Sequence, residues 1–227
     1  MADTVLSVSF NQDFACFACG TQDGFFVYNT DPLKRCYFEK LPGGISAVEM
    51  LFRCNYVAVI AGGQNPAFPS NVVVVWDVVN HKEVMRLEMK EDVKAARLRR
   101  DFIVAVLHNS VEVYSFTSAP EKLFVFGTYK NPHGLCCLCQ SSDNALLAFP
   151  AASSPGSIAI VNLCENERQQ QILTAHRRPI CALALNSTGS QLATASEKGT
   201  IVRVFDTNTL MLIKELRRGA NPANIYW

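Results

Sequence analysis

The sequence repeats one pattern five times, and this repetition limits the fold more than any other feature. Apolar, β-branched and aromatic runs alternate with clusters of Gly, Pro, Asn, Asp and Ser, as expected for strands separated by turns. No amphipathic helical stretch of useful length interrupts them. The first strands of the repeats begin at intervals of roughly 40 to 46 residues, near Val8, Ala47, Val93, Gly134 and Ile180. The chain is therefore predicted to be all-β.

Each repeat reads as four strands, the unit of a blade in a WD-repeat β-propeller. The third strands end in VYNTD, VWDV, VYSF, IVNL and VFDT, and Trp76 and Asp77 form a full WD dipeptide. The predicted blades cover approximately residues 5–42, 43–90, 91–130, 131–175 and 176–219. Residues 220–227, which end in NIYW, are predicted to begin a sixth blade. Residues 1–227 would then form a single incomplete propeller, a shortened form of a larger one, with open strand edges and apolar blade faces.

Composition excludes several classes of protein. The 21 Lys and Arg residues nearly balance the 20 Asp and Glu residues, so the net charge of +1 gives no reason to expect nucleic-acid binding. No apolar run reaches the length of a transmembrane helix, and the N-terminus lacks the pattern of a signal peptide. A cytoplasmic protein is therefore expected. The nine cysteines lie mostly in apolar strand-like runs and are predicted to be small buried hydrophobic residues.

No motif indicates catalysis or a metal site. The sequence lacks a G-x-S-x-G elbow, a phosphate-binding loop and an HExxH pattern, and its four histidines lie in different repeats. Two CxxC strings run from Cys16 to Cys19 and from Cys136 to Cys139. Residues three apart on a strand face opposite sides, which is poor geometry for zinc. We therefore expect no enzymatic activity, no metal and no cofactor.

Several strings carry a family resemblance: FNQD (residues 10–13), VEMLFRCN (48–55), LRRD (98–101), NPHGLC (131–136), LLAFP (146–150), ATASEKGT (193–200) and LRRG (216–219). Together they resemble the PROPPIN family, seven-bladed propellers that bind phosphoinositides in autophagy and endosomal traffic. The most diagnostic string is LRRG, which stands at the end of the fifth repeat as it does in that family. The resemblance covers nearly the whole chain, but the rest of blade six and all of blade seven have no counterpart in it.

The resemblance implies separate roles for the two arginines of LRRG. Successive strand residues point to opposite faces, and in the family the paired arginines serve two headgroup pockets on either side of the strand. Arg217 is thus expected to reach the first phosphoinositide headgroup and Arg218 the second. Gly219 is expected to let the backbone turn or approach closely where a Cβ would obstruct it. The local alternative is a solvated strand end whose charges deter edge pairing.

The same resemblance adds other side chains of the fifth repeat to the first pocket: His176, Ser196, Lys198, Thr200 and Arg203. Hydroxyls and cations of this kind can complete a phosphate site around an arginine. For His176 a structural alternative stays open, because in WD repeats a histidine before the first strand often bonds to the Ser, Thr or Asp of its blade. The charges of KAARLRRDFIV (residues 94–104) are expected to point outward from a half-buried strand.

A second functional surface is expected on the first two repeats. FNQD and the excursion AGGQNPAFPSN (residues 61–71) lie where family members engage a large autophagic lipid-transfer protein, so Asn11 and Asp13 are candidates for partner binding. The alternative is that both residues serve a turn.

The predicted function is that of a non-enzymatic membrane effector in autophagy. It would recognise phosphatidylinositol 3-phosphate or the 3,5-bisphosphate and recruit autophagy proteins while peripherally bound to preautophagosomal and endosomal or lysosomal membranes. Two alternatives stay open: a WD-repeat interaction scaffold that is independent of lipid, and a shortened form that is inactive or dominant-negative.

Overall fold

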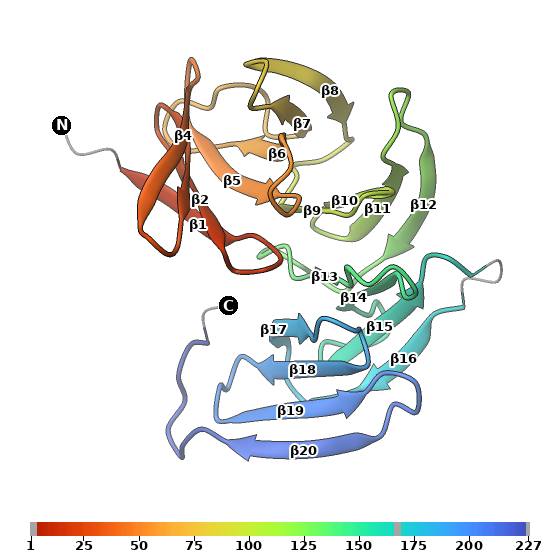
Figure 1. Cartoon of the computed structure of the whole chain (residues 1–227). Helices are drawn as coiled ribbons and strands as arrows, with labels where there is room; N and C mark the ends of the chain where they lie inside the picture. The colour runs from red at the N-terminus through yellow and green to blue at the C-terminus, as the bar shows by residue number, and fades with distance from the viewer. Residues whose placement is uncertain (1–3, 166–168, 226–227) are drawn as a thin grey trace. The chain divides into compact units, whose positions relative to one another are not determined.

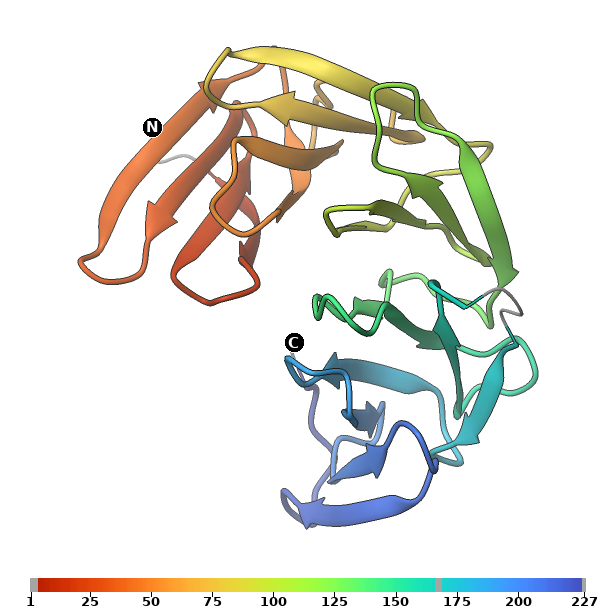
Figure 2. The same ribbon diagram turned by 45° about the vertical axis from the view of Figure 1, so that its right-hand side comes forward.

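The computed structural model describes residues 4–165 and 169–225, and all regular secondary structure within these ranges is β-strand. The strands form five antiparallel sheets of four, and in each sheet the strands neighbour one another in sequence order (Figures 1 and 2). This arrangement confirms the all-β prediction and the five four-stranded repeats. Residues 220–225 contain no strand, and Tyr226 and Trp227, which belong to the predicted sixth blade, lie outside the described residues.

The strands have the following bounds. The first sheet contains β1 (Val5–Phe10), β2 (Cys16–Thr21), β3 (Gly24–Asn29) and β4 (Lys34–Lys40). The second contains β5 (Ile45–Met50), β6 (Tyr56–Ala61), β7 (Val72–Asp77) and β8 (Lys82–Glu88). The third contains β9 (Ala95–Leu98), β10 (Phe102–Val106), β11 (Ser110–Ser115) and β12 (Lys122–Gly127). The fourth contains β13 (Cys137–Leu138), β14 (Leu146–Pro150), β15 (Ser157–Asn162) and β16 (Gln171–Thr174). The fifth contains β17 (Ile180–Leu185), β18 (Gln191–Ser196), β19 (Ile201–Asp206) and β20 (Leu212–Arg217).

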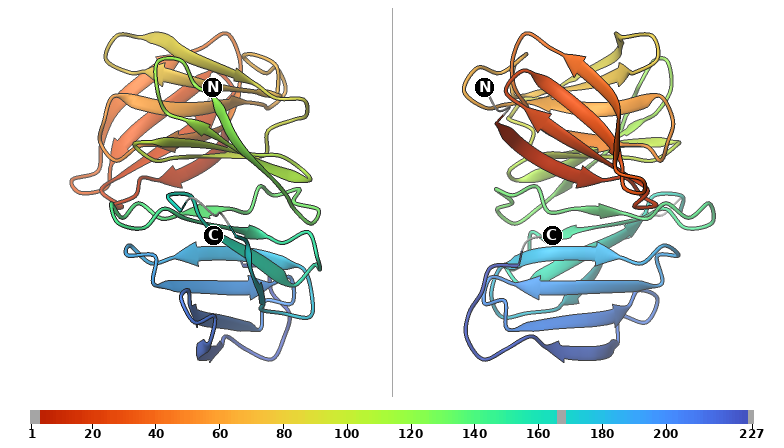
Figure 3. Two further views of the ribbon diagram at one scale, coloured as in Figure 1. Left: turned by 90° about the vertical axis from the view of Figure 1, so that its right-hand side faces the viewer. Right: turned by 60° about the vertical axis from the view of Figure 1, so that its left-hand side comes forward.

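The chain divides into two compact units. One comprises Met1–Leu107 and Glu112–Val125, and the other comprises His108–Val111 and Phe126–Trp227. Within the first unit, strand β1 contacts β5, and β5 in turn contacts β9. Within the second unit, β13 and β14 contact β17, and Figure 3 shows the fifth sheet as a simple meander from β17 to β20. In each unit, therefore, the first strand of one sheet lies against the next sheet.

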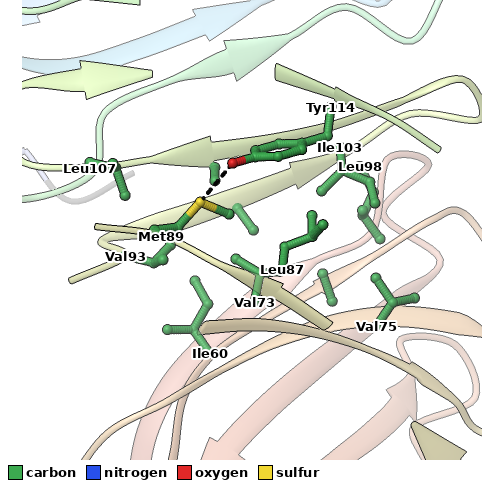
Figure 4. Close-up of a cluster of buried hydrophobic side chains, with 13 residues drawn as sticks. Ile60, Val73, Val75, Leu87, Met89, Val93, Leu98, Ile103, Leu107 and Tyr114 are labelled. Carbon is green, nitrogen blue, oxygen red and sulfur yellow. Dashed lines mark hydrogen bonds between the residues drawn. The ribbon is translucent and has the colours of Figure 1, made fainter. Parts of the chain in front are cut away.

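The first unit has two core clusters: one joins the first and second sheets, and the other lies between the second and third sheets (Figure 4). Val73, Leu98 and Ile103 are fully buried there, and burying a side chain of this kind contributes about 1.5–3 kcal/mol. Met89, from the connection between β8 and β9, lies in the same cluster, where its Sδ accepts a hydrogen bond of 3.2 Å from the Tyr114 hydroxyl. The connection between these two sheets is therefore part of the core.

In the second unit, another cluster joins the fourth and fifth sheets. Leu146, Ile158 and Ile160 from the fourth sheet pack with Leu192 and Phe205 from the fifth. Successive side chains along a strand point to opposite faces of the sheet. This packing therefore uses one side of β18 and β19 and fixes which side chains face the fourth sheet. The apolar pattern of the repeats thereby sets the orientation of the strand that carries LRRG.

The aspartate of the WD dipeptide closes a turn. Asp77 Oδ1 accepts hydrogen bonds from the backbone N–H groups of Val79 (3.0 Å) and Asn80 (3.1 Å), and Oδ2 accepts one from Asn80 Nδ2 (2.8 Å). These bonds, above all the one from the Asn80 side chain, lower the pKa of Asp77 to about 2. Asp206, in the fifth repeat, accepts from the backbone N–H groups of Asn208 and Thr209 in the same way. The repeat pattern thus has a local structural cause.

Two expectations about side-chain exposure need correction. Arg99 is buried, because β9 ends at Leu98 and the next residue lies in a turn outside the strand alternation, where its guanidinium pairs with Asp101 at 2.8 Å. Among the cysteines, Cys36, Cys54 and Cys164 are exposed, whereas the paired positions of both CxxC strings are buried. All nine cysteines are free thiols.

Candidate functional site

Three segments of the fifth repeat meet at one end of the fifth sheet. They are the connection that enters β17, the turn between β18 and β19, and the end of β20. The N–H of Glu197 donates to the carbonyl of Pro179 (3.0 Å), and the N–H of Arg218 donates to the carbonyl of Thr200 (2.9 Å). This end of the sheet therefore brings together most of the site residues predicted from the sequence.

Strand register places several of these side chains on one face. Thr194 is opposite Arg203, Arg203 is opposite Glu215, and Arg217 is opposite Ile201, two residues before Arg203. Because side chains alternate along a strand, Thr194, Ser196, Arg203, Glu215 and Arg217 share one side of the sheet. We call this set the Arg217 face. Glu215 belongs to it, although it is not among the site residues predicted from the sequence.

Arg217 is the last residue of β20, and its side chain is exposed. Within residues 4–165 and 169–225, its guanidinium makes no hydrogen bond and no ion pair. A guanidinium carries five N–H donors in a planar fork that matches a phosphate or a carboxylate. These donors are therefore available to a ligand.

Arg203 is partly occupied by contacts within the protein. Its Nε donates to Glu215 Oε2 at 2.8 Å, and its Nη1 donates to the carbonyl of Ala175 at 2.5 Å. The ion pair crosses from β19 to β20, and the carbonyl bond reaches the segment that precedes β17. Arg203 consequently joins three segments of the site and has fewer donors left for a ligand than Arg217.

His176 lies beside this cluster and is half-buried. Its Nε2 is 3.0 Å from Thr194 Oγ1, which is the structural hydrogen bond that the alternative interpretation expects. Burial lowers the pKa of His176, and the positive charge of Arg203 lowers it further. The imidazole is therefore neutral at pH 7, so it contributes hydrogen bonds rather than charge to the Arg217 face.

Arg218 makes different contacts from its neighbour. Its Nε donates to the carbonyl of Gly199 and its Nη2 to the carbonyl of Asn221, both at 2.7 Å. These carbonyls belong to the β18–β19 turn and to the segment that follows β20. The two adjacent arginines thus differ: Arg218 is bonded to the backbone, whereas Arg217 is open to solvent.

The remaining predicted residues lie in or next to the β18–β19 turn. Ser196 and Thr200 are buried, and Lys198 is exposed. Thr200 contacts Arg218 through its carbonyl, so it is associated with that residue more closely than with Arg217. Ser196 belongs to the Arg217 face, and Lys198 lies in the turn itself.

The expected role of Gly219 stays a prediction, because no described atom lies close to it. A Cβ built at Gly219 would meet no described atom within 4 Å, and its backbone is outside the left-handed region. The glycine that the geometry requires is Gly199, with a φ of +62° and a position where a Cβ would lie 1.8 Å from the carbonyl oxygen of Ala223. The physical reason is that the segment after β20 folds back across the β18–β19 turn and crosses it at Gly199.

The candidate partner residues lie in the first unit. Asn11 is buried, its Oδ1 accepts from the N–H of Cys16 (3.0 Å), and its Nδ2 donates to the carbonyl of Phe52 (3.2 Å). Asp13 is more exposed and lies 3.6 Å from Arg53. Asn11 therefore acts as a turn residue that joins two turns, and Asp13 is the member of the pair that faces solvent.

Two features of the site were not predicted from the sequence. Glu215 was detectable, because it precedes Arg217 by two residues and must share its side of β20. The Asn221 carbonyl was not, because no side-chain pattern predicts where a backbone oxygen will lie. In the described ranges, no group of three or more His, Cys, Asp and Glu residues could hold a metal ion, and no helix there is long and apolar enough to cross a membrane.

Known proteins resemble this chain over almost its full length. It is 38% identical over 228 residues to SVP1-like protein 2 of Pichia angusta, with 97% of this chain and 62% of the relative covered. It is 33% identical over 247 residues to autophagy-related protein 18 of Yarrowia lipolytica, with 100% of this chain and 61% of the relative covered. The chain therefore spans about 60% of the length of these relatives.

Solved structures agree with the fold. Hsv2 of Kluyveromyces lactis matches with a TM-score of 0.85 and 27% identity over 98% of this chain and 67% of that one. A complex described as KlAtg21 with the coiled-coil of AgAtg16 matches with a TM-score of 0.82 and 25% identity over 97% and 73%. These matches confirm the predicted β-propeller.

The family model named PROPPIN matches residues 4–224. This range includes all five sheets and both arginines of LRRG. The chain belongs to the PROPPIN family.

Proposed function

We propose that this chain binds phosphoinositide headgroups through the Arg217 face and acts as a peripheral membrane effector in autophagy. The observation that carries this proposal is the contrast within LRRG. Arg217 has an exposed guanidinium with no described partner, while the backbone around it is held by Arg218 and the β18–β19 turn. A free cationic fork on a strand end whose backbone is held by hydrogen bonds is suited to an anionic ligand.

The chemistry of the face fits a phosphate ester. Arg217 would hold two phosphate oxygens in a bidentate manner. Ser196 and His176 would supply uncharged hydrogen bonds, and Lys198 would add a cation from the tip of the turn. Arg218 would serve a second headgroup on the other side of the strand once a ligand competes with its carbonyl partners. Thr200 would support that second position through its backbone contact with Arg218.

The names of the relatives support the biological setting that we propose. One similar protein is named autophagy-related protein 18, and the family resemblance implies phosphatidylinositol 3-phosphate or the 3,5-bisphosphate as the lipid. We therefore place the protein in the cytoplasm and on preautophagosomal and endosomal or lysosomal membranes. Each basic residue near an anionic membrane surface adds about 1 kcal/mol of attraction, so the Arg217 face would act together with nearby cations.

Vesicle flotation tests this function. The chain is expected to float with vesicles that contain phosphatidylinositol 3-phosphate and to remain unbound with vesicles of phosphatidylcholine alone. The double variant Arg217→Thr, Arg218→Thr should lose flotation while it keeps the circular dichroism spectrum of the wild type. The variant Arg86→Thr, Arg100→Thr loses the same two charges elsewhere and should still float. Unchanged flotation of the LRRG variant would contradict the proposal.

A second candidate function is a protein-interaction scaffold that is independent of lipid. It is favoured by the solved relative in which KlAtg21 is bound to the coiled-coil of AgAtg16, and by the exposed Asp13 and Arg53 on the first unit. An autophagic lipid-transfer protein or another autophagy protein would be the partner. A folded wild-type chain that fails to float with any phosphoinositide would favour this scaffold function.

A further inference from the structure

We propose that Glu215 determines specificity on the Arg217 face by limiting that face to a single phosphomonoester group. This inference rests on the proposed function and goes beyond it, because it selects among ligands of the same class. The ligand chemistry is a phosphomonoester on an inositol ring, carried either by a membrane lipid or by a soluble inositol phosphate.

The position of Glu215 places it beside the ligand. Two residues along a strand are separated by about 6.6 Å and point to the same side, so the Glu215 and Arg217 side chains lie in adjacent rows of the Arg217 face. Register confirms the rows: Glu215 is opposite Arg203, and Arg217 is opposite Ile201. A phosphate held by the Arg217 guanidinium would therefore have the Glu215 carboxylate as its neighbour along β20.

The charges of the face accommodate one phosphate group. Arg203 and Glu215 form an ion pair of 2.8 Å and together carry no net charge. His176, which borders the face, is neutral because of burial and the nearby Arg203 charge. Arg217 is thus the one cation among the face residues whose charge no described carboxylate balances. Lys198, at the tip of the β18–β19 turn and outside the face, adds a second positive charge. The two cations together complement one phosphomonoester, which carries a charge of about −2 at pH 7.

A second phosphate on the same ring would bind this face unfavourably. It would have to lie close to the Glu215 carboxylate, which repels it, or replace that carboxylate as the partner of Arg203. Replacement would release Glu215 without a partner and would also disturb an arginine that bonds to the carbonyl of Ala175. Either route weakens binding of a bisphosphate relative to a monophosphate on this face.

The ion pair is exposed enough to be altered without loss of fold. The side chains of Arg203 and Glu215 are 32% and 43% exposed, and pairs at such positions contribute little to stability. Glu215→Gln keeps the size of the side chain and removes its charge. Glu215→Thr removes the charge with a residue that suits an exposed strand, so failure of one variant to fold leaves the other decisive.

The experiment measures dissociation constants of the intact chain for vesicles that contain phosphatidylinositol 3-phosphate or the 3,5-bisphosphate. It also measures them for the soluble glycerophosphoinositol 3-phosphate and 3,5-bisphosphate, in which the 1-phosphate stays a diester as in the lipid. Glu215→Gln is expected to tighten binding of the bisphosphate about fivefold and to change binding of the monophosphate by less than about twofold. Glu83→Gln, which removes a carboxylate paired with Arg86 at 2.6 Å on β8, is the matched control and should change neither. The soluble ligands should show the same selective gain as the vesicles.

Several outcomes would overturn the inference. Equal tightening for both ligands would show a general charge effect, and no tightening would show that Glu215 does not meet the second phosphate. A gain seen with vesicles alone would assign the effect to the membrane surface and not to the headgroup. In all three cases the proposed function would stand if Arg217→Thr still abolished binding. If Arg217→Thr had no effect, the proposed function itself would fail.

Discussion

Met89 and Arg218 occupy the same position in two repeats, yet the side chain of Met89 is buried and that of Arg218 is exposed. The residue after each fourth strand donates its N–H to a carbonyl before the third strand at 2.8–3.1 Å, and the five donors are Leu41, Met89, Thr128, Ala175 and Arg218. In the second repeat this position holds a buried methionine within the core (Figure 4). In the fifth it holds an exposed arginine bonded to backbone carbonyls.

The five repeats share the backbone at this position and differ in the side chain that it carries. The shared backbone bond shows that the repeat fixes where this residue lies, whatever its side chain. Leu41, Met89, Thr128 and Ala175 are buried or partly buried, so four repeats use the position for packing. The fifth repeat places a cation there and another cation, Arg217, immediately before it. The fifth repeat therefore differs from the other four in the side chains at this strand end and not in the backbone hydrogen bond.

The largest effect on stability is expected from a substitution of Met89, the residue that packs in the core. Met89→Ala should lower the free energy of unfolding by about 2–5 kcal/mol, because it removes a buried side chain from the core and leaves a cavity. Urea denaturation followed by circular dichroism measures the change. Arg218→Ala, made in parallel, should cost far less. Equal losses for the two variants would mean that the two positions do not differ as described.

The second prediction concerns the two glycines near the arginines. Gly199→Ala should destabilise the chain by about 1–2 kcal/mol from its left-handed backbone alone, and the Cβ would also push away the segment at Ala223. Gly219→Ala should change stability by less than about 0.5 kcal/mol, because the added methyl group meets open space. Chemical denaturation of both variants makes the test. A larger loss for Gly219→Ala would contradict the described path of the chain.

The third prediction separates Arg217 from Arg218 in the absence of ligand. Arg218→Ala should cost about 1 kcal/mol, because it removes two hydrogen bonds to backbone carbonyls at a partly exposed site. Arg217→Ala should stay within about 0.5 kcal/mol of the wild type, since its side chain has no described partner. The same denaturation experiment applies. A reversed order would show that the contacts of the two residues have been exchanged.

The smallest effect is expected from pH. The folded chain lowers the pKa of His176, so the unfolded chain binds a proton at higher pH than the folded one does, near the ordinary value of about 6.5. Stability should therefore fall as the pH drops below about 6.5, and this loss should shrink in His176→Gln. Unfolding at pH 7.5 and 5.5 measures it, with the exposed His133→Gln as control. An unchanged pH dependence in His176→Gln would exclude the histidine as the cause.

Much of the fold was predictable because its signals are local and repeated. Turn residues and apolar runs recur in every repeat, and the Asp77 and Asp206 turns show why those residues recur. The opposite directions of Arg217 and Arg218 also follow from strand alternation. The exposure of Arg99 was predicted wrongly, because the sequence does not show to within one residue where β9 ends. A shift of one residue decides whether a side chain follows the strand alternation.

The details of the site were less predictable because they depend on where segments cross. Nothing in the sequence indicates that the chain after β20 passes the turn at Gly199 and not at Gly219. The bonds from Arg218 to two carbonyls likewise depend on that path. Glu215 could have been selected by alternation, but an acid was not expected in a site for an anion. The assignment of these residues to a headgroup stays a prediction.

The most direct test of the account is to observe the arginine side chains while a headgroup is added. In ¹H–¹⁵N NMR spectra of the Nε–H groups, assigned with Arg217→Lys and Arg218→Lys variants, titration with soluble glycerophosphoinositol 3-phosphate should shift the Arg217 signal. The Arg218 signal, whose Nε–H already donates to the Gly199 carbonyl, should shift less at the same concentrations. An unchanged Arg217 signal, with binding detected elsewhere on the chain, would contradict the claim that its free guanidinium is the anion contact.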